Sequence, residues 1–337
     1  MFAILVSFVS CAYYLEHEEK SFISWMRSTN QFFTGEEYQT RFGIFMTNFR
    51  FVKGHNAANK MFTVALNQFA AYTPAEYKSL LGIKKSLSKR PATKIQRKSN
   101  ADSVDWRDKG VVNDIKNQLQ CGSCWAFSAL QAAESANAIS SGKLECYSAQ
   151  NLVDCVTTCD NCVGGMMNDA YDFVISNQGG HFVLECDYQY TAMAGTCRFN
   201  ECKPAGSISK YINIVEGDED DLAAKIETYG PAAVAIDASF LSFQLYSGGI
   251  YNEPSCSPYD YNHGVGCIGF GSQDGVKYWI VRNSWGITWG EQGYMKMIWN
   301  DNQCGIATVA SVPFVWIKWW LNYMNHDLLV LIIIHDG

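Results

Sequence analysis

Thirteen cysteines narrow what this 337-residue chain can fold into more than any other feature of its sequence. Disulfides persist in oxidising compartments, and a cytosolic enzyme of this size usually carries far fewer cysteines. We therefore expect a protein that is secreted or held in a vesicle, with several disulfides. The length and the hydrophobic fraction of 48% also predict a full core and at least two folding units.

The first twelve residues agree with export. An apolar run from Phe2 to Val9 is followed by the small residues Ser10, Cys11 and Ala12, a pattern typical of a short signal peptide cleaved near residue 12. A buried N-terminal strand is the alternative interpretation. The run is far shorter than the ~20 residues of a membrane helix, so we expect no stable membrane span here.

Charge divides the rest of the chain into two parts. Residues 12–100 contain 14 Lys and Arg against 6 Asp and Glu, whereas residues 101–313 contain 11 against 25. The opposite signs suggest that the two parts bind each other within one chain. The basic residues gather at 84–99, where apolar residues are too sparse to bury a face, so a solvated linker is predicted there. A nucleic-acid partner is not expected behind a signal peptide and ahead of an acidic domain.

Helical spacing dominates the basic part. Phe42, Phe45, Phe49 and Val52 recur on one face, and the stretch around them predicts one or two amphipathic helices. A short strand is expected at 62–66, and the Thr73-Pro74 pair then predicts the start of another helix.

The acidic part changes from helical to strand-like along its length. A long apolar helix is expected from Cys124 to the glycine stop at Ser141-Gly142, and a second helix at 165–177. Beyond Gly230-Pro231, glycine turns separate four β-rich runs, at 232–238, 264–271, 277–285 and 293–299. The fold class is therefore α+β, with a helical half, an antiparallel sheet half and a cleft between them.

Cys121 and Cys124 stand three residues apart at the start of the long helix. Such a pair can be a redox couple, but a thioredoxin-type site needs a short βαβ unit, and here a polar loop precedes Cys121. It can be half of a zinc site with Cys155, Cys159 and Cys162, although such cysteines in an oxidising compartment more often form disulfides. The third interpretation is a nucleophile beside a structural thiol.

A nucleophilic cysteine requires a base, and only two of the six histidines, His181 and His263, lie in the acidic part. His263 opens a predicted strand of the sheet half, so it could meet Cys124 across the cleft, whereas His181 fits a loop. A neighbouring imidazole and a helix N-terminus both lower the pKa of a thiol, which predicts a thiolate–imidazolium pair.

Four stretches resemble the papain/cathepsin family of cysteine proteases. They are SVDWRDKG at 103–110, CGSCWAF at 121–127, CVGG at 162–165 and VRNSWGITWGEQGY at 281–294. Upstream, six residues fit the family's inhibitor-helix pattern E-x3-R-x3-F-x2-N-x3-I-x3-N, with Val in place of Ile: Glu37, Arg41, Phe45, Asn48, Val52 and Asn56. The whole chain resembles a cathepsin L-like precursor of the protist type.

The resemblance implies a papain-like fold of two subdomains, a helical left half and an antiparallel, β-barrel-like right half, behind a mainly α-helical inhibitory prodomain. We accordingly divide the chain into a signal peptide at 1–12, the prodomain with its basic linker at 13–100, the peptidase domain at 101–313 and an atypical C-terminal extension at 314–337.

The family's catalytic roles carry over to four positions. Cys124 would be the nucleophile, and His263 would accept and return its proton. Asn283 would hold the imidazole ring, with Trp285 shielding that hydrogen bond; a simple turn asparagine is the alternative. Gln118 would donate to the oxyanion together with the backbone N–H of Cys124.

The resemblance also implies how a substrate binds. Gly164 and Gly165 would let a peptide backbone approach and pair in extended form. A largely apolar pocket with no acid at its base would favour bulky apolar side chains over arginine at P2, the second position before the scissile bond. The residues around this pocket are Met166, Met167, Ala235, Tyr261, Gly264 and Val309. The alternative is that the methionines only fill the core.

The implied disulfides are Cys121–Cys162, Cys155–Cys197 and Cys256–Cys304, each contributing ~2–4 kcal/mol, while Cys124 stays free. Cys159 could pair with Cys202, and Cys267 would pack as a small hydrophobe in its strand. The cysteines outside the implied set are Cys146, Cys159, Cys186, Cys202 and Cys267.

Some positions depart from the family pattern without removing a reacting group. These are Leu119, Ala149, Val163 and Asn262. In the prodomain, Ala65 and Ala71 replace a glycine and an aspartate, which puts its stability or its pH response in doubt. The extension from Phe314 contains an LLVLIII run that is too short to span a bilayer, so an irregular or artefactual tail is preferred to a membrane anchor.

The sequence therefore predicts a cysteine endopeptidase that is made as an inactive precursor and cleaves proteins and peptides without metal or cofactor. Its partners would be its own prodomain and cystatin-like inhibitors. We expect a monomer, outside the cell or in a lysosome-like vesicle. The alternatives are a catalytically inactive homologue that binds peptides or inhibitors, and a thiol–disulfide oxidoreductase, which a reversible Cys121–Cys124 disulfide would reveal.

Overall fold

The computed structural model describes residues 17–58, 60–84, 91–92 and 99–315. The expected signal peptide, most of the basic linker and nearly all of the C-terminal extension lie outside the described residues. Within the described ranges, every helix is too short or too polar to cross a membrane.

The N-terminal part is a small helical unit with an aromatic core. Its elements are a helix at 17–29, α2 (Gly35–Ala57), β1 (Phe62–Val64) and α3 (Pro74–Ser79). Phe22 is fully buried at the centre, with ring centres 5.1 Å from Phe45 and 5.5 Å from Phe42. Thr73 caps α3 as predicted, because its hydroxyl accepts from the N–H of Glu76 while the Glu76 carboxylate accepts from the N–H of Thr73.

The helical half of the acidic part is built around α4 (Cys124–Ser141), which ends where the sequence predicts. Gly142 takes a φ of 74°, a left-handed conformation that glycine adopts without a steric cost. The small alanines of α4 let it pack closely against α6 and strand β8. The other elements of this half are α5 (Ala149–Cys155), α6 (Met167–Asn177), β3 (His181–Val183), η2 (Phe199–Glu201) and β4 (Pro204–Ser207).

The sheet half follows the four predicted β-rich runs and adds strands to them. Its strands are β2 (Val104–Asp105), β5 (Lys210–Asn213), β6 (Ala232–Ile236), β7 (Tyr246–Tyr251), β8 (His263–Gln273), β9 (Val276–Arg282), β10 (Tyr294–Ile298) and β11 (Val309–Phe314). Its helices are η1 (Trp106–Lys109), α7 (Glu219–Tyr229), α8 (Leu241–Gln244) and η3 (Gln303–Gly305).

The strand order is β1-β7-β10-β9-β8-β6-β11-β5, with β2 paired to β8. This path is open, so the expected barrel-like half is a sheet that does not close, and its β7–β10 pair is parallel rather than antiparallel. Strand β1 of the N-terminal part extends the sheet at β7. At the other end of the sheet β11 pairs with β5, and its last residue, Phe314, lies opposite Lys210.

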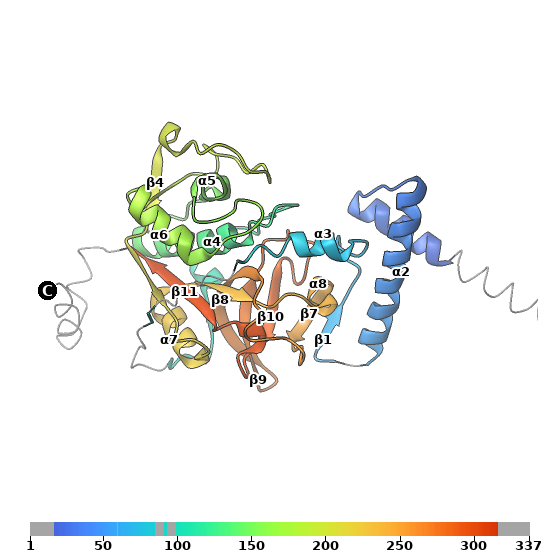
Figure 1. The fold of residues 1–337 in the computed structure, drawn as a ribbon. Helices are drawn as coiled ribbons and strands as arrows, with labels where there is room; N and C mark the ends of the chain where they lie inside the picture. The colour runs from blue at the N-terminus through green and yellow to red at the C-terminus, as the bar shows by residue number, and fades with distance from the viewer. Residues whose placement is uncertain (1–16, 59, 85–90, 93–98, 316–337) are drawn as a thin grey trace, which may run out of the picture.

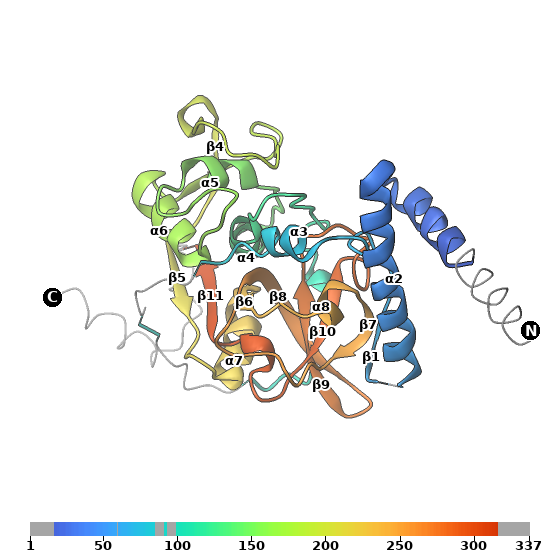
Figure 2. The ribbon, with the colours of Figure 1, turned by 45° about the vertical axis from the view of Figure 1, so that its right-hand side comes forward.

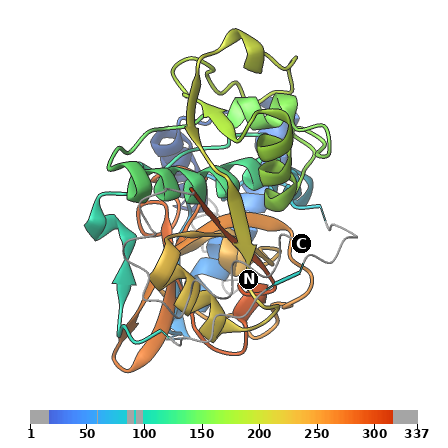
Figure 3. The ribbon, with the colours of Figure 1, turned by 90° about the vertical axis from the view of Figure 1, so that its left-hand side faces the viewer.

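The two halves form separate layers. In Figure 1 the helical half lies above the sheet half, with α3 along the boundary and α2 beside β1 and β7. The view in Figure 2 agrees, and Figure 3 shows the same two layers from the side. The N-terminal part therefore contacts the sheet edge with one element and reaches the boundary between the halves with another.

The structure contains the three expected disulfides, Cys121–Cys162, Cys155–Cys197 and Cys256–Cys304. They leave Cys124 as a free thiol, and Cys267 is buried in β8. The suggested Cys159–Cys202 pair does not form, because Cys159 lies against the Met166 carbonyl and Cys202 against that of Asp187. Pairing of Cys121 with Cys162 contradicts the redox interpretation and removes two ligands from the zinc interpretation.

Candidate active site

Cys124 is the first residue of α4 and is buried at the boundary between the two halves. Its thiol lies within hydrogen-bond reach of the backbone N–H of Gly264, which follows His263 in β8. The thiol also accepts from the N–H of Gly82 in the N-terminal part, at 3.2 Å. The positive end of the helix dipole at this position favours a thiolate.

His263 is the first residue of β8, and its ring is held from the neighbouring strand. Its Nε2–H donates to Oδ1 of Asn283, directly after β9, at 2.8 Å. The indole ring of Trp285 lies 4.6 Å from the imidazole, centre to centre, and covers this pair. Nδ1 of His263 is buried and has no hydrogen-bond partner among the described residues, so it is available to accept a proton. The other candidate, His181, is exposed and bonded to the Gly206 carbonyl.

The side chain of Gln118 is buried, and a hydrogen bond from Ser284 fixes its orientation. Its Oε1 accepts from the hydroxyl of Ser284 at 2.8 Å, which leaves its Nε2 as the donor toward the cleft. Nε2 donates to the carbonyls of Cys121 and Leu80, both at 2.9 Å. Leu80 belongs to the N-terminal part, so a peptide carbonyl already occupies this donor.

The segment 80–84 of the N-terminal part lies in the cleft and forms an isolated β-bridge between Ile83 and Gly165. The N–H of Gly165 donates to the carbonyl of Gly82 at 2.9 Å, and that of Lys84 donates to the carbonyl of Gly165 at 3.0 Å. On the opposite wall, the N–H of Ile83 donates to the Asn262 carbonyl at 3.0 Å. We call residues 80–84 the cleft segment.

Three glycines make this close approach possible. A Cβ on Gly82 would lie 1.8 Å from the carbonyl oxygen of Gly122, and one on Gly164 would lie 2.9 Å from the Gly82 carbonyl oxygen. Gly164 also takes a φ of 143°, which side-chain-bearing residues rarely adopt. A Cβ on Gly165 would lie 2.7 Å from the Trp125 ring. A larger residue at Gly82 or Gly164 would push the cleft segment away from the wall of the cleft, and one at Gly165 would clash with Cys159 and Trp125.

Two family models match the chain. The model of the papain family cysteine proteases matches residues 100–314, and that of the cathepsin propeptide inhibitor domain (I29) matches residues 22–77. The chain belongs to the papain family of cysteine proteases. The predicted resemblance is thereby confirmed, and the N-terminal part that enters the cleft is the prodomain of this protease.

Proteins similar to this chain match it over most of its length. The chain is 38% identical over 327 residues to cysteine proteinase 3 of Dictyostelium discoideum (93% of this chain, 96% of that protein). It is 40% identical over 298 residues to digestive cysteine proteinase 2 of Homarus americanus (85% and 91%). Among solved structures, digestive procathepsin L 3 of the Tenebrio molitor larval midgut superposes with a TM-score of 0.81 at 35% identity (88% and 99%).

Burial in the precursor shifts the pKa values of the two candidate reacting groups, Cys124 and His263. It raises the pKa of the Cys124 thiol to about 11, a shift that backbone N–H groups oppose. Burial also lowers the pKa of His263 to about 4. Both shifts favour the neutral thiol and the neutral imidazole. The thiolate–imidazolium pair expected from the sequence is therefore disfavoured while the prodomain covers the cleft.

The residues expected around the P2 pocket of the protease belong, apart from Gly264, to the same apolar cluster as Ile83 of the cleft segment. Ile83 contacts the position of Gly264 closely, since a Cβ there would lie 3.2 Å from Ile83 Cδ1. The same apolar cluster contains Met166, Met167, Ala235, Tyr261 and Val309. Met167 is fully buried at the start of α6, so it also serves as core.

Sequence reasoning missed the cleft segment, although it found the residues that surround it. Lys84 was assigned to a solvated linker, but its backbone pairs with Gly165. Leu80 and Gly82 act through backbone groups, which leave no side-chain pattern to recognise. The only sequence signal is the apolar Leu80-Leu81-Gly82-Ile83 stretch directly after α3. One departure also has a structural consequence: Leu119, where the family has glycine, takes a φ of 52° and is exposed.

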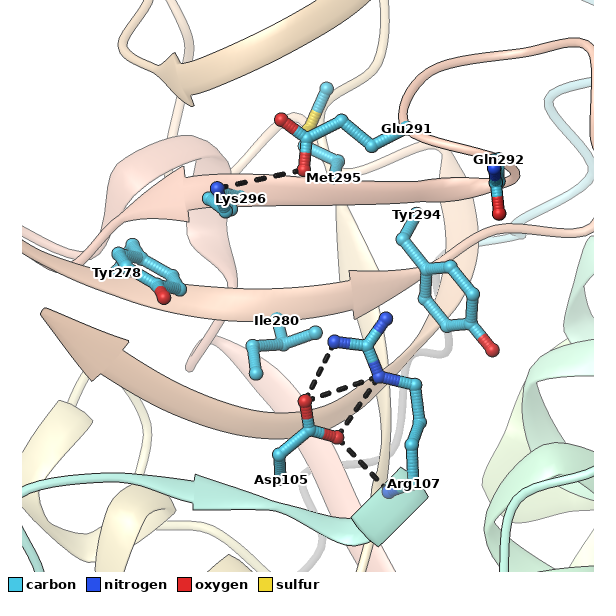
Figure 4. A pocket seen from close by; sticks show the side chains of 9 residues that line it. All are labelled: Asp105, Arg107, Tyr278, Ile280, Glu291, Gln292, Tyr294, Met295 and Lys296. Atoms are coloured by element: carbon cyan, nitrogen blue, oxygen red, sulfur yellow. Dashed lines mark hydrogen bonds and ion pairs between the residues drawn. The ribbon is translucent and has the colours of Figure 1, made fainter. Parts of the chain in front are cut away.

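A separate hollow of about 460 Å³ lies in the sheet half of the protease, lined by residues of β2, η1, β9, β10 and the loop before β10 (Figure 4). Its charged side chains pair with one another. Arg107 binds Asp105 at 2.6 Å, and Lys296 lies 3.7 Å from Glu291. None of the residues that line this hollow belongs to the candidate active site.

Proposed function

We propose that this protease is an endopeptidase that acts through Cys124 and His263. In the open cleft, the Cys124 thiol gives its proton to Nδ1 of His263, and the thiolate attacks the carbonyl carbon of the substrate. His263 passes that proton to the leaving amine, and a thioester to Cys124 remains. Water then gives a proton to His263 and attacks the thioester, which releases the carboxylic acid and restores Cys124.

The observation that carries this proposal is the peptide carbonyl bound by Gln118. Its Nε2 lies 2.9 Å from the Leu80 carbonyl oxygen, beside the Cys124 thiol that binds Gly82. A substrate carbonyl at the same place meets Gln118 and the N–H of Cys124 when its oxygen becomes negative. Donors aligned in this way stabilise the tetrahedral intermediate without having to reorganise.

The surroundings of His263 support its assigned role. Because Asn283 accepts from Nε2–H, the proton of the neutral ring is held on Nε2 and the lone pair is on Nδ1. Trp285 excludes water from this hydrogen bond. Asn283 itself also accepts from the N–H of Ser284, which fixes the orientation of its amide. Asn283 and Trp285 act through His263 and are positioning residues.

The pocket around Ile83 supports a preference for bulky apolar side chains at P2. Its walls are apolar except for the hydroxyl of Tyr261. An arginine there would lose water without gaining a partner, which is costly. Gly165 would bind the substrate backbone through its N–H and carbonyl, as it binds that of the cleft segment, and Gly164 would leave room for that approach.

The remaining parts of the proposal concern the whole chain. We infer a signal peptide at 1–12, removal of the prodomain and linker at 13–100, and a monomeric mature enzyme from residue 101. Three disulfides support an oxidising location, outside the cell or in a lysosome-like vesicle. Proteins, peptides and cystatin-like inhibitors are the proposed partners.

Fluorogenic peptides that differ only at P2 test the proposal on acid-activated enzyme, with and without an epoxide thiol inhibitor. We expect Leu and Phe to exceed Arg by roughly tenfold or more in kcat/KM. Val309→Glu should narrow or reverse that preference by giving arginine a partner. Equal values for Phe and Arg in the unmutated enzyme would contradict the pocket assignment. Absence of inhibitor-sensitive hydrolysis would instead indicate an inactive, peptide-binding homologue.

A further inference from the structure

Two cysteines without a disulfide stand at the open end of the β3–β4 pair in the helical half. The two strands are antiparallel, and their pairing ends with Val183 opposite Pro204. Cys186 follows Val183 closely along the chain, and Cys202 closely precedes Pro204. Residues that face each other in an antiparallel pair have Cα atoms ~4.5–5.5 Å apart. The two cysteines therefore lie on facing sides of the loop that β3 and β4 close.

Contacts beyond the paired strands keep the two sides of this loop together. Sγ of Cys202 lies 3.8 Å from the carbonyl oxygen of Asp187, and Sγ of Cys186 lies 3.8 Å from the Oδ1 of the same residue. Further out, the guanidinium of Arg198 lies 4.4 Å from the centre of the Tyr188 ring, and the N–H of Arg198 donates to the Tyr188 hydroxyl at 3.3 Å. A disulfide needs Cα atoms ~4.4–6.8 Å apart, a separation that side-by-side chains of this kind provide.

The other free thiols of the described residues have different surroundings. Cys146 accepts from the Nζ of Lys116 at 3.4 Å. Three more are buried: Cys124, Cys159 and Cys267. Cys186 is exposed and Cys202 is half-buried, so a small oxidant can reach both. The three disulfides of the same domain indicate an oxidising location, in which accessible neighbouring thiols do not stay reduced.

We propose that Cys186 and Cys202 form a fourth disulfide by exchange with a low-molecular-weight disulfide such as oxidised glutathione. The thiolate of Cys186 attacks one sulfur of that molecule, which gives a mixed disulfide and releases one thiol. The thiolate of Cys202 then attacks the Cys186 sulfur and releases the second thiol. The protein loses two protons and two electrons, and the small disulfide takes up both as it becomes two thiols. This inference goes beyond the proposed peptidase function and does not depend on it.

The bond closes a loop that supports the candidate active site. The loop carries Tyr190, whose hydroxyl donates to the Gln118 carbonyl at 2.8 Å and lies 2.7 Å from the hydroxyl of Ser123, directly before Cys124. Each disulfide present in the structure has one buried cysteine, whereas neither Cys186 nor Cys202 is buried. Exposed disulfides are the more readily reduced. The proposed bond should therefore open before the other three, and its loss should loosen this loop.

A disulfide map of the Cys124→Ser precursor tests the proposal without interference from the active-site thiol. The protein is folded in a mixture of reduced and oxidised glutathione, and its free thiols are blocked with N-ethylmaleimide in denaturant. Pepsin then cleaves it in acid, where thiolates are scarce and disulfides do not exchange. Mass spectrometry should find Cys186 and Cys202 in one linked pair of peptides, with no maleimide on either.

Single substitutions and a matched control check the pairing. Cys186→Ser should leave Cys202 free to react with the maleimide, and Cys202→Ser should do the same for Cys186. Cys146→Ser, which removes a partly exposed thiol of the same half, should leave the linked pair intact. A reductant concentration that opens only the proposed bond should lower the Tm by about 2–8 °C. The same treatment should leave the Tm of the double variant Cys186→Ser and Cys202→Ser unchanged.

Other results overturn the proposal in distinguishable ways. Maleimide on both Cys186 and Cys202 in the Cys124→Ser precursor, with the three known disulfides intact, would show that the two thiols stay reduced. A link from either cysteine to Cys146, to glutathione or to a second chain would assign it another partner. Because the map of the parent protein gives the answer directly, a variant that fails to fold does not protect the proposal.

Discussion

The prodomain and the catalytic domain are stabilised in different ways. The sequence places no cysteine between Ala12 and Gln120, whereas three disulfides tie the catalytic domain across separations of 41, 42 and 48 residues. The prodomain depends on an aromatic cluster around Phe22, on the Arg41–Glu76 ion pair and on one short strand added at β7. Its stability rests on packing and charge, which acid can change, and the catalytic domain adds covalent links, which acid leaves intact.

Replacing Cys124, the proposed nucleophile, should produce the largest effect on activity. It should also separate the loss of catalysis from any loss of prodomain binding. Cys124→Ser should lower turnover on the order of 10⁴–10⁶-fold, because an alcohol lacks the nucleophilicity of a thiolate. The precursor should still fold and keep its prodomain bound, since the substitution leaves the disulfides of the catalytic domain and strand β1 unchanged. Peptide hydrolysis and thermal unfolding measure the two properties. Retention of a tenth of the rate would refute the nucleophile assignment.

Two matched stability variants sharpen the comparison between the domains, both made in the Cys124→Ser precursor. Phe22→Ala should destabilise the prodomain by ~3–5 kcal/mol, since a fully buried ring is lost. The double substitution Cys256→Ala and Cys304→Ala should destabilise the catalytic domain by ~2–5 kcal/mol. Calorimetry should show each change in a different transition. One shared transition that moves in both variants would mean that the domains unfold as a unit.

Gln118 touches both the prodomain and the proposed transition state, so its loss should affect them unequally. Gln118→Ala should cost about 10²–10³ in kcat, the scale for one oxyanion donor. Its bond to the Leu80 carbonyl is an ordinary neutral hydrogen bond, so binding of the separately added prodomain should weaken by only ~0.5–1.5 kcal/mol. Equal losses in the two measurements would contradict the oxyanion role.

The smallest expected effect is a shift in the acid sensitivity of the prodomain. His55 is buried on α2, where its Nε2–H donates to the Phe62 carbonyl at the start of β1. Burial lowers the pKa of His55, with Lys60 adding to the shift and Glu253 opposing it. The unfolded prodomain therefore takes up the proton first. The contribution of neutral His55 to the stability of the prodomain is complete above about pH 6.5. It is lost as the pH falls from there to the pKa of His55 in the folded prodomain.

Glu76 responds in a lower range of pH. The hydrogen bond from Arg41 lowers the pKa of Glu76 to about 2, so the contribution of Glu76 to stability persists down to about pH 4.5 and is lost between there and about pH 2.

Precursor processing should accelerate below about pH 5, after His55 is protonated. His55→Gln, which keeps a donor for the Phe62 carbonyl, should move this onset to lower pH, as followed on gels. His17→Gln, on the exposed N-terminal helix, is the control; equal onsets would exclude His55 as a trigger.

Much of the fold could be predicted because its signals are local. The Thr73-Pro74 start of α3 and the Gly142 end of α4 each depend on residues within one helical turn. The β-rich runs appeared as β6, β8, β9 and β10 for the same reason. That the sheet does not close into a barrel depends on pairing between strands far apart in sequence, which no local pattern records. The reach of β11 to Phe314 depends likewise on its pairing with Lys210.

The candidate site divides in the same way. The sequence by itself determined which residue types could do the chemistry, because Cys124, His263, Asn283 and Gln118 stand in recognisable motifs. Only the tertiary structure decided what fills the cleft. Leu80, Gly82, Ile83 and Lys84 contact it through backbone groups, the apolar side chain of Ile83 and one exposed ion pair. It also decided that burial favours the neutral forms of Cys124 and His263 in the precursor. Backbone hydrogen bonds and desolvation depend on which distant segments come together, and no side-chain pattern along the chain encodes them.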